Sequence, residues 1–127
     1  MRVISLDIGT VRTGYAFGDT DLGVALARKD VVLSSNLIQF LEREFYSDPF
    51  EVVLFGMPKN RDNQDTDMTK MVIKSMEVIQ EKFPHIKIAQ VNERLTTKMA
   101  ALNIGKGKYL DNEAARIMLQ EWLDRNS

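Results

Sequence analysis

The sequence predicts an α/β protein in which helices flank a mixed, five-stranded β-sheet. Near the N-terminus, apolar runs separated by short glycine-containing turns indicate three antiparallel strands. Further along, stripes of apolar residues at helical spacing alternate with two apolar, strand-like runs, which is typical of strand–helix–strand units with parallel strands. The chain of 127 residues, 44% of them hydrophobic, is long enough to bury a core, and we expect residues 1–127 to form one domain.

The first three strands are expected at residues 2–9, 14–19 and 24–33, and GTVRTG forms the turn between the first two. A helix is expected over residues 34–48, because Leu37, Phe40, Leu41 and Phe45 recur at helical spacing. Ser34 or Ser35 is its candidate N-cap.

The second half of the chain supplies the parallel strands. EVVLFG is a short, wholly apolar run, as expected of a strand that is buried on both faces. The expected elements are strands at 51–56 and 85–91, a helix at 68–83, a short helix at 96–103, and a last helix at 111–124.

Asp7 interrupts the apolar run of the first strand immediately before a glycine turn. A carboxylate at such a position is costly unless it is paired, hydrogen-bonded or bound to a metal. In open α/β sheets, ligands gather at the carboxyl ends of strands, which is where Asp7 lies. Asp7 is therefore either a metal ligand or the cap of the turn that follows it.

Two further acids lie at positions of the same kind. Glu93 follows the strand at 85–91, which could neighbour the first strand, and Asp111 opens the last helix, where it could equally serve as an N-cap. Mg²⁺ is usually held by a few carboxylates together with water and substrate phosphate. Two such ions, about 4 Å apart, can stabilise both oxygens of an in-line phosphoryl displacement. Asp7, Glu93 and Asp111 together are our candidate catalytic and metal-binding residues.

Basic residues fall in the segments that flank these acids, where they could contact a phosphate-bearing substrate. Thr96, or its neighbour Thr97, is expected to cap the short helix. The alternative for each basic residue is an ordinary solvated side chain. The candidates are Arg12, Lys59, Arg61, Arg94, Lys106 and Lys108.

The composition narrows the classes of function. With no cysteine, the chain has neither disulfides nor thiolate metal sites. Its only histidine, His85, is expected in a surface turn, so no Ser–His pair is indicated. The N-terminus lacks the apolar core of a secretory signal, and no run is long enough to span a membrane, so we expect a cytoplasmic protein. A net charge of −1 gives no support to non-specific nucleic-acid binding.

Four stretches resemble the YqgF/RuvX family, in the same order along nearly the whole chain: LDIGTVRTGYAFGD, VVLFGMPKN, NERLTT and LDNEAARIMLQEWLD. The resemblance implies an RNase H-like fold and a nuclease that matures precursor 16S ribosomal RNA or resolves Holliday junctions. Its acids fall on Asp7, Glu93 and Asp111. Its other motif residues fall on Gly9, Arg12, Gly14, Gly56, Pro58 and the run from Glu93 to Thr97.

The chain departs from the family pattern at two positions. Asn63 stands where a glycine usually follows the G-x-P turn, and asparagine tolerates the left-handed conformation. Asn92 replaces the acid that usually precedes Glu93. Glu93, rather than position 92, is therefore our candidate metal ligand in that motif.

The leading hypothesis is a nuclease dependent on Mg²⁺ or Mn²⁺, with water as the nucleophile, acting on structured RNA and in contact with ribosomal assembly intermediates. Gly9, Arg12, Lys59, Arg61, Arg94, Thr96, Lys106 and Lys108 are the expected substrate contacts. We expect a monomer or a weak homodimer and no membrane association. The alternatives are a resolvase of branched DNA, a non-catalytic RNA-binding module, and a nucleotide-binding domain, which 127 residues are too few to complete.

Overall fold

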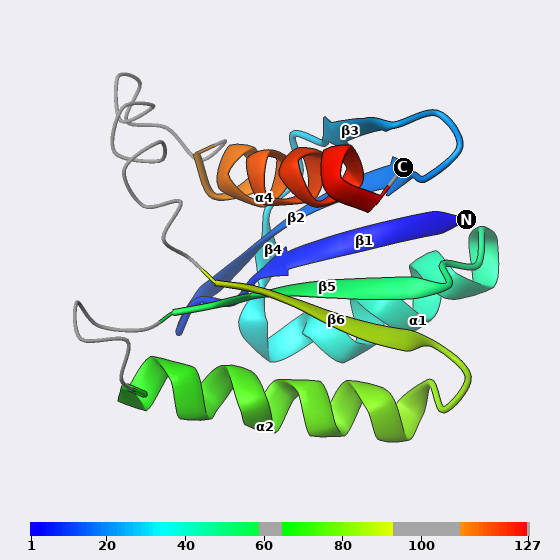
Figure 1. Ribbon diagram of the computed structural model, residues 1–127. Coiled ribbons are helices and arrows are strands. Elements are labelled where there is room, and N and C mark those ends of the chain that lie inside the picture. The colour runs from blue at the N-terminus through cyan, green and yellow to red at the C-terminus, as the bar shows by residue number, and fades with distance from the viewer. Residues whose placement is uncertain (59–64, 93–109, 127) are drawn as a thin grey trace.

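The computed structural model of the chain describes residues 1–58, 65–92 and 110–126, with backbone only at Asn92, Leu110 and Asp111. These residues form a mixed sheet with helices on both faces (Figure 1). Its strands are β1 (Arg2–Asp7), β2 (Arg12–Asp19), β3 (Val24–Ala27), β4 (Val32–Leu33), β5 (Val52–Met57) and β6 (Lys87–Asn92). Its helices are the 3₁₀ turn η1 (Ser34–Asn36), α1 (Leu37–Ser47), α2 (Asp67–Lys82) and α4 (Leu110–Asn126).

The strand order is β3-β2-β1-β5-β6, with β4 pairing the start of β2. β1, β2 and β3 are antiparallel neighbours, whereas β5 runs parallel to β1 and β6 runs parallel to β5. The predicted mixed sheet is thus confirmed, with six strands in place of five. β5 lies between β1 and β6, so the strand expected at 85–91 does not neighbour the first strand.

The strand predicted at 24–33 is wrong as a single element, because it is divided into β3 and β4. β3 pairs with the end of β2 and β4 with its beginning, and residues 28–31 leave the sheet between them. The carbonyls of Arg28 and Asp30 both accept hydrogen bonds of 2.7 Å from Nδ2 of Asn112 in α4. The carbonyls in the segment between β3 and β4 are therefore hydrogen-bonded by a side chain more than 80 residues away along the chain.

Alternation along the strands creates two cores. Ile4 and Leu6 point toward α1 and α2, whereas Val3 and Ala16 pack against Ala115, Met118 and Leu119 of α4. All six residues of β5 are buried, which confirms that this strand is covered on both faces. Figure 1 shows α4 on one side of the sheet and α1 and α2 on the other.

The helices lie close to their predicted positions, but the N-cap expected for the first one is wrong. η1 precedes α1, and Asn36 occupies the N-cap position of α1 without a hydrogen bond from its side chain. The hydroxyl of Ser34 instead donates a hydrogen bond to the carbonyl of Gly9. α2 starts from a capping box formed by Thr66 and Thr69. The helix expected at 96–103 lies outside the described residues. None of the helices described is long and apolar enough to cross a membrane.

Candidate nuclease site

Asp7 is the last residue of β1, and it lies half-buried at the carboxyl end of the strand. Its partner on β2 is Gly14, so no side chain stands directly opposite it on that neighbouring strand. Val3 packs against α4 and Ser5 bonds to it, so the alternation along β1 places Asp7 on the same face. The acid that interrupts the apolar strand therefore lies where the α4 layer meets the end of the sheet.

The register of α4 brings Asp111 to the level of Asp7. Ser5 Oγ donates a hydrogen bond of 2.8 Å to the carbonyl of Ala115. Asp111 precedes Ala115 by one helical turn, about 6 Å, while Asp7 follows Ser5 by two strand residues, roughly 6.6 Å.

These two displacements have the same direction because α4 runs antiparallel to β1. Further along the helix, the side chains of Leu119 and Leu123 approach Gly18, which pairs with Val3 at the beginning of β1. The backbones of Asp7 and Asp111 therefore lie level on one face of the sheet.

Asn112, next to Asp111, fixes this arrangement. Its side chain is 2% exposed, and its Oδ1 accepts a hydrogen bond of 3.0 Å from the backbone N–H of Tyr15. Its Nδ2 donates to the carbonyls of Arg28 and Asp30. The first turn of α4 is thus bound to β2 one residue from Gly14, the partner of Asp7. Nothing in the sequence marks Asn112 for this role, because an amide beside an acid in a first turn is an ordinary helix-start pattern.

Gly9 and Ser34 shape the loop between β1 and β2. A Cβ at Gly9 would lie 2.2 Å from the carbonyl oxygen of Arg12, so the turn leaves no space for a side chain. Ser34 Oγ donates a hydrogen bond of 2.6 Å to the carbonyl of Gly9. The backbone N–H of Ser34 donates one of 2.8 Å to the carbonyl of Val11. The hydroxyl of Thr13 lies 2.8 Å from Ser34 Oγ. From the sequence, Ser34 is expected only as a helix cap.

Arg12 is the exposed first residue of β2. Ala16 packs in the α4 core, so alternation along β2 places Gly14 and Arg12 on that face too. Arg12 thus lies on the same face of the sheet as Asp7, and at the same end of the strands. A guanidinium there is suited to binding phosphate close to the acids.

A hydrogen bond from α2 holds the end of β5, at the same end of the sheet as Asp7. The hydroxyl of Thr69, fully buried in the first turn of α2, donates to the carbonyl of Pro58. The register pairs Met57 at the end of β5 with Asn92 at the end of β6. Both strands run parallel to β1, so their carboxyl ends lie at the same end of the sheet as Asp7.

Seven candidate residues lie outside the described ranges, although the segments that hold them adjoin β5, β6 or α4 in sequence. They are Lys59, Arg61, Glu93, Arg94, Thr96, Lys106 and Lys108. Of the acids, Asp7 is described in full and Asp111 by its backbone. Within residues 1–58, 65–92 and 110–126, no three histidine, cysteine or acidic side chains form a metal cluster.

The chain is similar to the proteins of one family along nearly its whole length. The chain matches the family described as "RuvX: Holliday junction resolvase" over residues 1–125. It is 33% identical to the "Putative pre-16S rRNA nuclease" of Christiangramia forsetii, over 96% of this chain and 97% of the relative. It is 31% identical to the protein of the same name from Flavobacterium johnsoniae, over 96% and 95% of the two chains.

Among solved structures, a ROK hexokinase from Thermus thermophilus is 19% identical, with a TM-score of 0.43, over 85% of this chain and 39% of that one. A likeness of that size bears on neither fold nor function. The match over residues 1–125 and the identity to full-length relatives decide the family. The chain belongs to the RuvX family.

Proposed function

We propose that this nuclease hydrolyses phosphodiester bonds in precursor 16S ribosomal RNA and depends on Mg²⁺ or Mn²⁺. Asp7, Glu93 and Asp111 hold the metal in this proposal. Gly9, Arg12, Lys59, Arg61, Arg94, Thr96, Lys106 and Lys108 bind the substrate. The observation that carries the proposal is the register of α4 on β1, set by the bond between Ser5 and Ala115.

The donor set fits a hard divalent cation. Aspartate and glutamate supply the oxygen ligands that Mg²⁺ and Mn²⁺ prefer, and no cysteine competes for a softer metal. Glu93 follows directly on β6, two strands from β1, and two strand spacings are about 10 Å. Together with Asp7 and Asp111, Glu93 would hold the cations that assist an in-line phosphoryl displacement.

The cations, when bound, would polarise the scissile phosphate and lower the pKa of the attacking water. The residues of this chain would then fix the geometry. Asn112 keeps the first turn of α4 at the level of β1, and Ser34 holds the loop that carries Gly9 and Arg12. Arg12 would orient the phosphate through paired hydrogen bonds.

The relatives' names support the choice of RNA. Proteins of nearly the same length as this chain, and about one-third identical to it, are named for the 16S precursor. We propose that the substrate is reached on ribosomal assembly intermediates in the cytoplasm, by a monomer or a weak homodimer.

Cleavage assays test the proposal directly. The substrate is RNA that carries the 5′ end of the 16S precursor, incubated with Mg²⁺, Mn²⁺ or EDTA. Asp7→Asn and Asp111→Asn are compared with wild type and with Glu42→Gln, an exposed acid of α1 whose side chain has no hydrogen bond or ion pair among the described residues. We expect metal-dependent cleavage that falls at least 100-fold in both aspartate variants, about the effect of losing one important catalytic interaction, and persists in the control.

Titration of Mn²⁺ by calorimetry provides a readout that does not depend on turnover. Wild type should bind the ion, and Asp7→Asn should bind it much more weakly. Cleavage that is equally strong in EDTA, or metal binding unchanged by both aspartate substitutions, would refute the metal-dependent mechanism.

The description of the matched family favours a second candidate, a resolvase of branched DNA. A four-way DNA junction belongs in the same assay. Faster cleavage of the junction than of the RNA, by a dimer that presents two sites, would select this alternative. RNA binding without cleavage of either substrate, even on assembly intermediates, would instead select a non-catalytic module.

A further inference from the structure

The two edges of the sheet differ in how they are covered. At β3, the side-chain amide of Gln120 accepts a hydrogen bond of 2.9 Å from the N–H of Ala25 and donates one of 2.8 Å to the carbonyl of Gly23. Gln120 thus occupies backbone groups that another strand would need. β6 forms the opposite edge, and in the part of the chain that the structure describes nothing pairs with its outer side. An uncovered edge strand is a template for strand addition.

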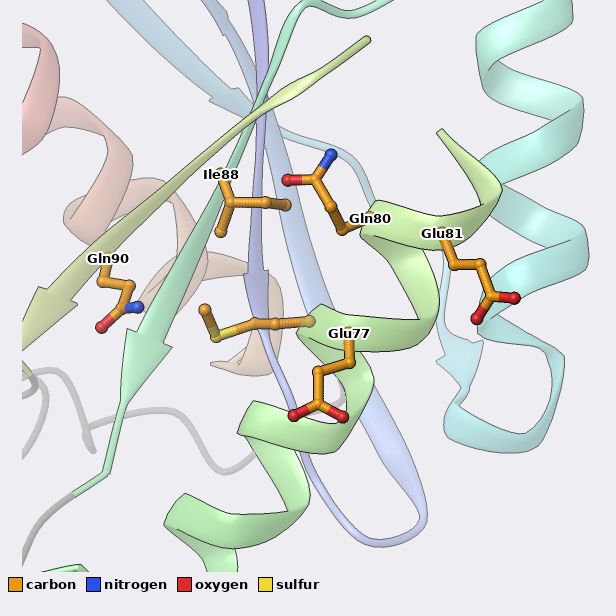
Figure 2. Close-up of a pocket in the computed structure, with 6 residues that line it drawn as sticks. Glu77, Gln80, Glu81, Ile88 and Gln90 are labelled. Carbon is orange, nitrogen blue, oxygen red and sulfur yellow. The ribbon is translucent and has the colours of Figure 1, made fainter. Parts of the chain in front are cut away.

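A groove lies beside this uncovered edge, between β6 and α2. Its volume is about 630 Å³, and it is lined by Met76, Glu77, Gln80, Glu81, Ile88 and Gln90 (Figure 2). Met76 and Ile88, which are partly buried against the core, supply its apolar surface. An edge strand next to a groove and a helix is the arrangement in which extended peptides add as strands and place alternate side chains in pockets.

The groove has a defined polar lining. Gln80 is engaged, because its Nε2 donates to the carbonyls of Phe83 and Ile86, each at 3.2 Å, which anchors the turn before β6. The amide of Gln90, an exposed residue of β6, has no hydrogen bond among the described residues. It is therefore available to an incoming chain.

Glu77 and Glu81 set the charge of the groove. They are exposed, lie one turn apart on α2, and neither forms an ion pair with a described residue. Two unpaired carboxylates repel phosphate and attract lysine or arginine. The groove is therefore complementary to a basic protein segment and not to a nucleic acid.

The groove is separate from the candidate nuclease site. The register places Ile88 level with Val53 and Ile4, three residues before Asp7 on β1. Ile4 and Ile88 lie on the α1–α2 face of the sheet, whereas Asp7 lies on the α4 face. The groove and Asp7 therefore lie on opposite faces of the sheet.

We propose that the edge of β6 and the α2 groove bind an extended, basic segment of a partner protein. The segment adds a strand to β6, its apolar residues cover Met76 and Ile88, and its lysine or arginine residues pair with Glu77 and Glu81. This docking site goes beyond the proposed nuclease function and does not depend on it.

Peptide binding to the full-length chain tests the proposal. The probe is a fluorescent peptide in which lysine alternates with valine, and the control peptide carries glutamate in place of each lysine. We expect saturable binding of the basic peptide alone, weakened by salt. In NMR spectra, the amide signals of residues 88–91 should shift, as strand addition requires.

Two variants locate the contact. Glu77→Gln/Glu81→Gln should weaken binding by about threefold to tenfold, the effect of losing two exposed ion pairs. The matched control, Glu42→Gln/Glu51→Gln, removes two other exposed glutamates and should bind as wild type does. All of these side chains are exposed, so the variants should fold, and nuclease activity should not change.

Several results would overturn the proposal. These are equal binding of both peptides, equal weakening in the control variant, or NMR shifts confined to the loop that contains Gly9. Self-association in sedimentation experiments that the Glu77→Gln/Glu81→Gln variant abolishes would identify the occupant as a second copy of the chain. RNA that shifts Ile88 and Gln90 and displaces the peptide would identify it as nucleic acid.

Discussion

The side chain of Asn112 accepts a hydrogen bond from the backbone N–H of Tyr15 at 3.0 Å, and this contact joins the start of α4 to the strand beside β1. The same amide closes the gap between β3 and β4. One buried residue thus serves both the fold and the level at which Asp111 lies over Asp7.

Replacing Asn112 with alanine should therefore be costly. The change leaves the buried N–H of Tyr15 without its partner, which costs about 1–3 kcal/mol, and it also removes the hydrogen bonds to the carbonyls of Arg28 and Asp30, two exposed residues. We expect the free energy of unfolding, measured in urea, to fall by about 2–4 kcal/mol. Asn126→Ala, at the exposed end of the same helix, should change it by less than about 0.5 kcal/mol. A loss no larger than that of the control would contradict this role.

Ser34→Ala should disturb the loop between β1 and β2. It removes the hydroxyl that bonds the carbonyl of Gly9 and lies 2.8 Å from the hydroxyl of Thr13. We expect a loss of about 1–2 kcal/mol in unfolding free energy and slower RNA cleavage. The neighbouring Ser35→Ala is the matched control, because Ser35 is exposed and its side chain has no hydrogen bond with the residues described. Equal behaviour of the two variants would exclude the proposed anchoring.

Two glycines should respond differently to alanine. At Gly9 the added Cβ would collide with the carbonyl of Arg12, so Gly9→Ala should reduce both cleavage and stability. At Gly23, φ is 67° and nothing lies within 4 Å of the added atom, so only backbone strain of about 1 kcal/mol is expected. Gly23→Ala should therefore cleave RNA at the wild-type rate. Undiminished activity in Gly9→Ala would contradict the tight turn.

The free energy of unfolding should depend on pH in the alkaline range because of Tyr15. Burial, reinforced by Asp30, raises the pKa of its phenol above 10.0. The unfolded chain then loses this proton before the folded chain does, so stability falls as pH rises through 10 toward the folded-state pKa. Urea titrations between about pH 9 and pH 11 should show this fall, reduced in Tyr15→Phe and unchanged in Tyr46→Phe, whose ring is 92% exposed.

The same substitution tests packing near neutral pH. The hydroxyl of Tyr15 is buried and has no hydrogen-bond partner among the described residues. Removing it therefore forfeits no bond, and Tyr15→Phe should be as stable as wild type or up to about 1 kcal/mol more stable. A loss greater than about 1 kcal/mol would show that the hydroxyl has a partner.

Arg12 should contribute to substrate affinity through charge. Arg12→Gln removes a cation from the edge that carries Asp7, so RNA binding should weaken and depend less on salt. In a plot of log K against log salt concentration, the slope should decrease by about 0.7–0.9. Arg43→Gln, on the exposed surface of α1, should leave the slope unchanged. The same slope for Arg12→Gln as for wild type would exclude a phosphate contact.

The sequence by itself determined most of the strands and helices that the structure describes, because the spacing of apolar residues shows which side of each element is buried. The doubly buried β5, the helical stripe of α2 and the position of Asp7 at the end of β1 were all readable in this way. The family motifs also predict the three candidate acids, of which the structure describes Asp7 in full and Asp111 by its backbone.

Tertiary structure alone decided how these parts meet. The division between β3 and β4, the loop anchor at Ser34 and the three bonds of Asn112 all join residues distant in sequence. The separation of β1 from β6 by β5 is likewise a matter of strand order. The spacing of apolar residues shows which side of an element is buried, but not which element packs against it. A polar side chain acquires its role only when folding brings a hydrogen-bond partner within reach.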